Sequence, residues 1–99
     1  MLLDLSKPIE TLEGKPYKEG SIEFTQGMML ARILSSRVSD VDAGEDPVEG
    51  MKYSKKLWAE SKIELEKTEV RKLMDFTRKA GIADLFKGQI VESIETQLK

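Results

Sequence analysis

Two helical stripes that follow one another in the last third of the chain place the strongest constraint on its fold. The first has mostly apolar side chains at helical spacing, with two more beside it: Val70, Leu73, Met74 and Thr77, flanked by Phe76 and Ala80. The second follows at once and consists of Ile82, Leu85, Phe86, Ile90, Ile94 and Leu98. We expect Thr68 to begin the first helix and Gly81 to end it, because glycine adopts the left-handed conformation of a helix C-terminus without a Cβ penalty. Both stripes need other parts of the chain to pack on.

The first 24 residues are expected to be extended. Met1–Leu5 and Pro8–Leu12 are short, partly alternating segments. A turn at Glu13–Pro16 would let Tyr17–Phe24 return as a partner strand. The buried side of this hairpin would carry Ile9, Leu12, Tyr17, Ile22 and Phe24. Because an isolated hairpin is marginal in water, it must lie on helices or gain a third strand. The candidate third strand is Ile63–Leu65.

Two further helices are predicted between these regions. Thr25 is a good N-cap for a helix that runs to about residue 37, with a stripe of Met29, Leu30, Ile33, Leu34 and Val38. Gly27 in its first turn costs up to ~1 kcal/mol, a cost often associated with close backbone packing. After a loop at 40–47, Asp46 as N-cap and Pro47 at the first helical position begin the next helix, which runs to about Ser61. It carries Val48, Met51, Leu57 and Trp58, with Tyr53 to one side.

The predicted fold is therefore α+β and mainly helical, with an N-terminal β-hairpin packed on about four helices. We expect residues 1–99 to form one domain, extended over 1–24 and helical over 25–99, because 99 residues suffice for one modest core. A hydrophobic fraction of 39% and a charged fraction of 34% are typical of a soluble globular protein. No apolar run is long enough to span a membrane, and the start of the chain lacks the features of a signal peptide. With no cysteine in the sequence, we expect a cytoplasmic location.

No catalytic, cofactor-binding or metal-binding residues are predicted. The chain has no cysteine and no histidine, so it lacks thiolate nucleophiles, the commonest general base and the commonest transition-metal ligand. A carboxyl group on a buried helix face would have a raised pKa and could serve as a general acid. Asp75 and Glu92 are instead expected to point outward into solvent. Tyr17 and Tyr53 have no basic partner by spacing. Glycines 14, 20 and 27 do not form a phosphate-binding loop. We therefore predict that the protein is not an enzyme.

An acidic cluster surrounds the central loop, namely Asp40, Asp42, Glu45, Asp46 and Glu49. Asp40 and Asp42 match the first and third places of a twelve-residue calcium loop. The match then fails, because Glu45 stands where the turn glycine is required and Met51 where the bidentate glutamate belongs. We expect these acids to be solvated and to favour the N-terminus of the next helix.

The charges are unevenly distributed. Residues 1–50 carry a net charge of −5, residues 51–80 of +4 and residues 81–99 of −1. A nucleic-acid-binding regulator would gather its basic side chains on one surface: Lys52, Lys55, Lys56, Arg71, Lys72, Arg78 and Lys79. The acids interleaved with these basic residues argue against nucleic acid as a partner. Trp58 and the methionines Met28, Met29, Met51 and Met74 are expected in the core. An exposed Trp58 would instead indicate a protein interface.

Several short motifs follow one another along the chain. The first is at its start, Leu3-Asp4-Leu5-Ser6-Lys7-Pro8-Ile9 followed by Thr11-Leu12-Glu13-Gly14-Lys15-Pro16. It is similar to the extended entry of small phage- and prophage-encoded proteins. Two of their helices are matched by residues 30–34 and 51–58, and a short extended step with the helix after it by residues 63–69. Their last glycine-containing helix is matched by residues 86–92. The resemblance covers nearly the whole chain except the central loop, and it offers no catalytic residues to transfer. It implies a phage or prophage gene product, often encoded near virion morphogenesis genes.

These observations favour a non-enzymatic module for protein–protein interaction or self-association, acting as an accessory or chaperone in head or tail assembly. The alternative is a small phage regulator that binds nucleic acid or a host transcription or replication protein.

Overall fold

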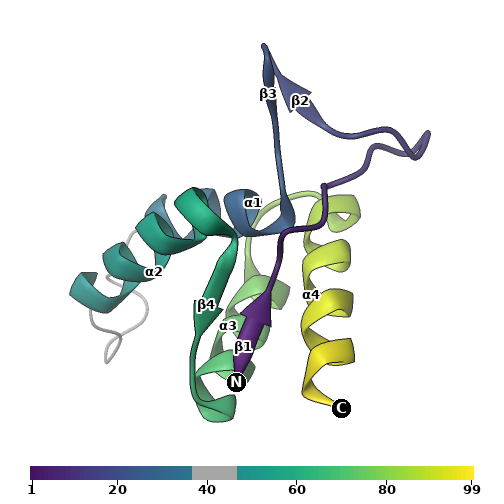
Figure 1. Ribbon diagram of the computed structural model, residues 1–99. Coiled ribbons are helices and arrows are strands. Elements are labelled where there is room, and N and C mark those ends of the chain that lie inside the picture. The colour runs from purple at the N-terminus through teal and green to yellow at the C-terminus, as the bar shows by residue number, and fades with distance from the viewer. Residues whose placement is uncertain (37–46) are drawn as a thin grey trace.

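The computed structural model describes residues 1–36 and 47–99, in which four helices and four short strands are found (Figure 1). In chain order they are β1 (Leu2–Asp4), β2 (Lys18–Glu19), β3 (Ile22–Glu23), α1 (Gln26–Ser35), α2 (Pro47–Glu60), β4 (Lys62–Glu64), α3 (Lys67–Lys79) and α4 (Asp84–Leu98). The α+β, mainly helical fold class is confirmed. Predictions for Val38, the loop at 40–46 and its Asp46 cap fall outside the described residues.

The N-terminal strand pairs with a strand from the middle of the chain. β1 is antiparallel to β4, with Leu3 opposite Ile63. Leu3 and Ile63 are buried, while the residues on either side of each are exposed, so both strands bury the same face. The strand predicted at Ile63–Leu65 is therefore present, one residue earlier, but its partner is β1 and not the predicted hairpin.

Residues 8–24 make an excursion in which the predicted hairpin is only partly formed. Ile9 donates its N–H to the Phe24 carbonyl at 2.9 Å and accepts the Tyr17 N–H at 2.7 Å. Regular pairing is limited to the two-residue strands β2 and β3, where Gly20 supplies the turn at φ 62°. Ile9 and Phe24 are buried as predicted, and Tyr17 is half-buried.

Two residues predicted to be buried in this hairpin are exposed. Leu12 is 89% exposed and Ile22 is 47% exposed. The reason is visible in Figure 1, where the loop between β1 and β2 and the tip of the β2–β3 hairpin both project away from the helices. Neither tip has a surface to pack on, so the prediction is wrong for both residues.

Helix α1 begins as predicted and lies very close to the end of α2. Thr25 Oγ1 accepts the Met28 N–H at 3.0 Å, and its hydroxyl shares a 2.5 Å hydrogen bond with the Ser61 hydroxyl. A Cβ added to Gly27 would lie 2.6 Å from the Ser61 Cβ. Gly27 is therefore required for the close approach of the start of α1 to Ser61. This confirms that close backbone packing accounts for a glycine in the first turn of α1.

Helix α2 starts at Pro47 as predicted and ends in a left-handed residue, Ser61, at φ 56°. Ser61 N–H bonds the Leu57 carbonyl at 2.8 Å, which closes the last turn before β4. Ser61 also binds the residue that follows β1, because its carbonyl accepts the Leu5 N–H at 2.8 Å. One residue thus ends α2, touches α1 and opens the β1–β4 sheet.

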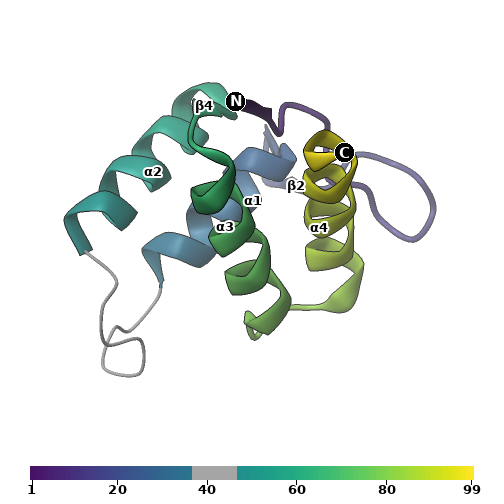
Figure 2. The same ribbon diagram turned by 90° about the horizontal axis from the view of Figure 1, so that it is seen from below.

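Helices α3 and α4 form the second helical pair (Figure 2). Val70, Leu73 and Thr77 are buried on α3, and Ile90 and Ile94 on α4. The other stripe residues are partly buried: Met74, Phe76, Ala80, Ile82, Leu85, Phe86 and Leu98. Helix α3 starts one residue before Thr68, with Glu66 at the N-cap.

Helix α3 ends next to Gly81 as predicted, but the predicted left-handed conformation of this glycine is wrong. Ala80 is the C-cap, with extended backbone at φ −64° and ψ 142°, and Gly81 does not have a positive φ. Lys87 on α4 donates its ammonium to the Ala80 carbonyl at 3.0 Å and to the Arg78 carbonyl at 3.3 Å. A side chain from the next helix thus satisfies helix-end carbonyls that a left-handed glycine motif would otherwise serve.

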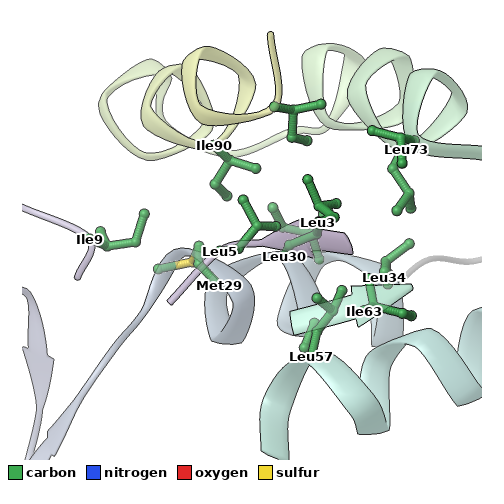
Figure 3. Packing of buried hydrophobic residues seen from close by; sticks show 14 of the residues in the cluster. Leu3, Leu5, Ile9, Met29, Leu30, Leu34, Leu57, Ile63, Leu73 and Ile90 are labelled. Atoms are coloured by element: carbon green, nitrogen blue, oxygen red, sulfur yellow. The ribbon is translucent and has the colours of Figure 1, made fainter. Parts of the chain in front are cut away.

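The buried apolar side chains meet between the two helical pairs and the sheet (Figure 3). They come from β1, α1, α2, β4, α3 and α4, with Leu3, Leu30, Leu57 and Ile90 among the fully buried ones. The core thus requires both ends of the chain at once.

Candidate interaction surface

The face of α2 that was expected in the core is largely exposed. Trp58 is 45% exposed and Met51 is 49% exposed, so the prediction that these two residues are buried is wrong. Val48 on the same stripe is also exposed, and only Leu57 of the predicted set is fully buried. Figures 1 and 2 both place α2 at one edge of the molecule, next to α1.

Small residues explain why α2 turns a different face toward the core than the predicted one. The buried and partly buried residues of α2 and its end are Gly50, Tyr53, Ser54, Leu57 and Ser61, and all of them except Tyr53 are small or lie at helical spacing with Ser54. Helix α2 lies against α1, whose buried residues include Gly27, Ala31 and Leu34. Small side chains on both helices let the backbones approach closely, while the large side chains of Met51 and Trp58 remain at the rim. Hydrophobic spacing alone misses this packing, because glycine and serine do not count as apolar.

Trp58 packs at the edge of the core against one aromatic neighbour. Its ring meets the buried Phe24 ring edge to face, with 5.7 Å between centroids and 79° between planes. The Arg32 guanidinium lies over Phe24, 4.5 Å from the ring centroid. The exposed indole is therefore fixed on one side and open on the other.

A polar network on the β2–β3 hairpin fixes Arg32. The Glu19 carboxylate pairs with both terminal nitrogens of Arg32, at 2.8 Å for the Nη2–Oε1 pair, and accepts the Tyr17 hydroxyl at 2.6 Å. The hydrogen bonds from Arg32 and then from Tyr17 lower the pKa of Glu19 to about 2. The bond to Glu19 also raises the pKa of Tyr17, which makes Tyr17 a poorer proton donor. The network is structural in character, and Arg32 is neutralised within it.

Two adjoining hollows lie between α1 and α2, and we call them together the α1–α2 groove. One has a volume of about 370 Å³ and is lined by Ala31, Arg32, Ser35, Ser54, Lys55 and Trp58. The other has a volume of about 380 Å³ and is lined by Leu34, Ser35, Pro47, Gly50, Met51, Ser54 and Lys55. Because Ser35, Ser54 and Lys55 belong to both, the hollows form one groove with Met51 in one half and Trp58 in the other.

The charged rim of the groove is basic. Lys55 lines both hollows, and among residues 1–36 and 47–99 no aspartate or glutamate lines either of them. Lys56 pairs with Glu60, four residues further on. Within residues 1–36 and 47–99, no carboxylate forms an ion pair with Lys55 or Lys52. Lys55 is therefore the available charge of the groove.

The basic side chains predicted for a nucleic-acid regulator are partly neutralised. Lys56 pairs with Glu60, Lys72 with Glu69 at 3.4 Å, and Arg78 with both Asp75 and Glu95. They are also divided between α2 and α3. These ion pairs reduce the positive charge, so they argue against the concentrated basic surface that nucleic-acid binding requires.

A second, polar hollow lies between the N-terminal segment and α4. It has a volume of about 430 Å³ and is lined by Asp4, Ser6, Lys7, Glu92, Ser93, Thr96 and Gln97. Hydrogen bonds from the Ser6 hydroxyl and N–H lower the pKa of Asp4, so this carboxylate stays ionised and is a poor general acid. Asp75 and Glu92 are exposed, as predicted.

In the part of the chain that the structure describes, no group of three or more acidic side chains could hold a metal ion. Of the acidic cluster, only Glu49 belongs to that part, and it is exposed on the first turn of α2. None of the described helices is long and apolar enough to cross a membrane.

The chain matches no protein-family model, and neither a curated protein nor a solved structure is significantly similar to it.

Proposed function

We propose that this protein is a non-enzymatic protein–protein interaction module of a phage or prophage, acting as an accessory or chaperone in assembly of the virion head or tail. The observation that carries the interaction part is the α1–α2 groove with its exposed Trp58. The origin and the assembly context rest on the sequence motifs that resemble small phage proteins.

The exposed Trp58 and Met51 leave apolar surface of the groove in contact with water when no partner is bound, which is unfavourable in free energy. Both residue types are enriched in protein interfaces, and truncated tryptophans are among the most damaging interface changes. Trp58 is also held in place by Phe24, so binding would not have to order it. The groove therefore offers a prepared apolar anchor site.

The alternative, a regulator that binds nucleic acid or the host transcription or replication machinery, has less support. Lys56, Lys72 and Arg78 already pair with acids of this chain, which weakens the charge available for phosphates.

Affinity capture from phage-infected or prophage-induced cells, followed by mass spectrometry, tests the proposal. The bait is compared with Met51→Ser and Trp58→Ala, and with Leu12→Ser as the control, because Leu12 is an exposed leucine far from the groove. Chemical denaturation establishes that each bait is folded. We expect a phage protein that the bait and Leu12→Ser retain and that both groove variants lose. A set of captured proteins that is the same for all baits would overturn the proposal. Met51→Ser remains informative if loss of the Trp58–Phe24 contact prevents folding.

A further inference from the structure

The α1–α2 groove combines two mainly apolar hollows with Lys55, which forms no ion pair within the described residues, and this combination restricts the chemistry of its occupant. Resting on the proposed function, we infer that the occupant is an acidic amphipathic helix of the partner protein, with apolar side chains in the two hollows and carboxylates beside Lys55.

The walls of the groove favour a helix over a strand. Both walls are helices, whose backbone groups are used internally, so an added strand would find no ladder to join. Ser54, at the centre of the groove, donates its hydroxyl to the Gly50 carbonyl at 2.8 Å and so is also occupied. Binding must therefore come from side-chain packing, which is how helices bind in grooves.

The spacing of the hollows matches the helical repeat. Met51 and Trp58 mark the two hollows and stand seven residues apart on α2, about 10 Å along its axis. A helix lying alongside α2 presents apolar side chains at i, i+3 or i+4, and i+7 over the same length. The small side chains of Ser35 and Ser54 between the hollows leave room for the middle residue.

The positive charge of the groove favours acidic side chains on either side of the apolar stripe of the partner helix. Lys55 lies at the junction of both hollows, and Lys52 stands one turn before it on α2. Arg32 at the far side is already paired with Glu19, and Lys56 with Glu60. The Lys55 ammonium is the only one that lines the groove among the described residues, and it suits a carboxylate on a mixed, partly apolar surface better than a continuous row of phosphates.

Trp58 is the only tryptophan in the chain, so its fluorescence reports occupancy of the groove directly. The probe is a designed helical peptide of about 18 residues. It carries leucines at i, i+4, i+7 and i+11 and glutamates at the flanking positions, without aromatic residues. A second peptide has lysine in place of every glutamate. The full-length protein is titrated with each peptide, and Trp58 emission is followed.

We expect the acidic peptide to shift Trp58 emission to shorter wavelength in a saturable way, and to bind roughly tenfold more tightly than the lysine peptide. Lys55→Glu should reverse this preference. Lys15→Glu, the same change on an exposed loop away from the groove, should leave it as in the unchanged protein. Raised salt should reduce the difference between the two peptides.

Several results would overturn the inference. One is equal binding of both peptides, or no change at Trp58 with either. Another is a Trp58 shift on raising the concentration of the protein alone, with the mass of a dimer, which would make a second copy the occupant. A similar shift with duplex or single-stranded DNA would make nucleic acid the occupant. In the cell-capture experiment, a partner lost with Trp58→Ala but retained with Lys55→Glu would refute the acidic helix and leave the proposed function standing.

Discussion

Gln97 on α4 binds the backbone of Asp4 on β1 at two points. Asp4 N–H donates to Gln97 Oε1 at 2.7 Å, and Gln97 Nε2 donates to the Asp4 carbonyl at 2.7 Å. Gln89, eight residues earlier on α4, makes the same pair with Glu10, at 2.8 and 2.9 Å. The two side-chain amides imitate a neighbouring strand, so α4 closes an edge of the N-terminal segment that none of the described strands covers.

Gln97→Glu keeps the acceptor of this pair and removes the donor. The Asp4 carbonyl then faces a carboxylate, so we expect the free energy of unfolding to fall by about 0.5–1.5 kcal/mol in urea denaturation at neutral pH. Thr96→Glu adds the same charge one residue away without touching the Asp4 backbone. An equal loss in both variants would show that added charge, and not the lost bond, is responsible.

Gly27→Ala and Gly88→Ala should change stability in opposite directions. A Cβ at Gly27 would lie 2.6 Å from Ser61 Cβ, so helix α1 or the end of α2 must shift, at a cost of about 1–3 kcal/mol. A Cβ at Gly88, inside α4, meets nothing within 4 Å, and alanine there should stabilise the helix by about 0.5–1 kcal/mol. Urea denaturation of both variants tests the pair, and a neutral Gly27→Ala would contradict the close approach.

Gln26 is buried, and within the described residues its side-chain oxygen has no hydrogen-bond partner. Gln26→Met removes an unsatisfied polar group, so we expect the free energy of unfolding to stay unchanged or rise by up to about 1 kcal/mol. Gln89→Met is the matched control, because it removes a glutamine that is fully bonded to Glu10, and it should destabilise by about 1 kcal/mol. Thermal melting of both variants makes the comparison, and loss of stability in Gln26→Met would show that the amide has a partner.

The Glu19–Arg32 pair should contribute to stability at neutral pH and not in acid. The pKa of Glu19 in the folded protein is about 2, below its ordinary value of 4.5. A lowered pKa means that the contribution is complete above the ordinary value and disappears as the pH falls from about 4.5 toward 2. Glu19→Gln should therefore melt at a lower temperature than the unchanged protein at pH 7, and the difference should close near pH 2. A difference that is the same at both pH values would exclude the carboxylate charge as its cause.

Local signals in the sequence predict much of the helical part. Thr25 and Pro47 start α1 and α2 as expected, because a capping hydroxyl and a fixed φ act within one turn. The apolar stripe of α1 is likewise buried. The end of α3 could not be predicted in this way, because the side chain that caps it, Lys87, belongs to the next helix.

The strand pairing and the face of α2 depend on distant residues. Nothing near Leu3 shows that its partner is Ile63, since both strands are three residues long and carry no turn between them. On α2, the stripe with Met51 and Trp58 competes with a stripe of small residues only one position away. Apolar spacing favours burial of the stripe with Met51 and Trp58. The close contact of Gly27 with Ser61 instead favours burial of the stripe of small residues. The groove follows from that choice.

The clasp between Asp4 and Gln97 also sets an order of events during synthesis. The codon for Gln97 is read 93 positions after that for Asp4, and the β4 partner of β1 also lies in the second half of the chain. Because a chain emerges from the ribosome N-terminus first, Leu3 and Leu5 leave the tunnel long before any surface exists to bury them. The core therefore cannot close until α4 has left the tunnel, and Leu3 and Leu5 remain exposed in the nascent chain until then.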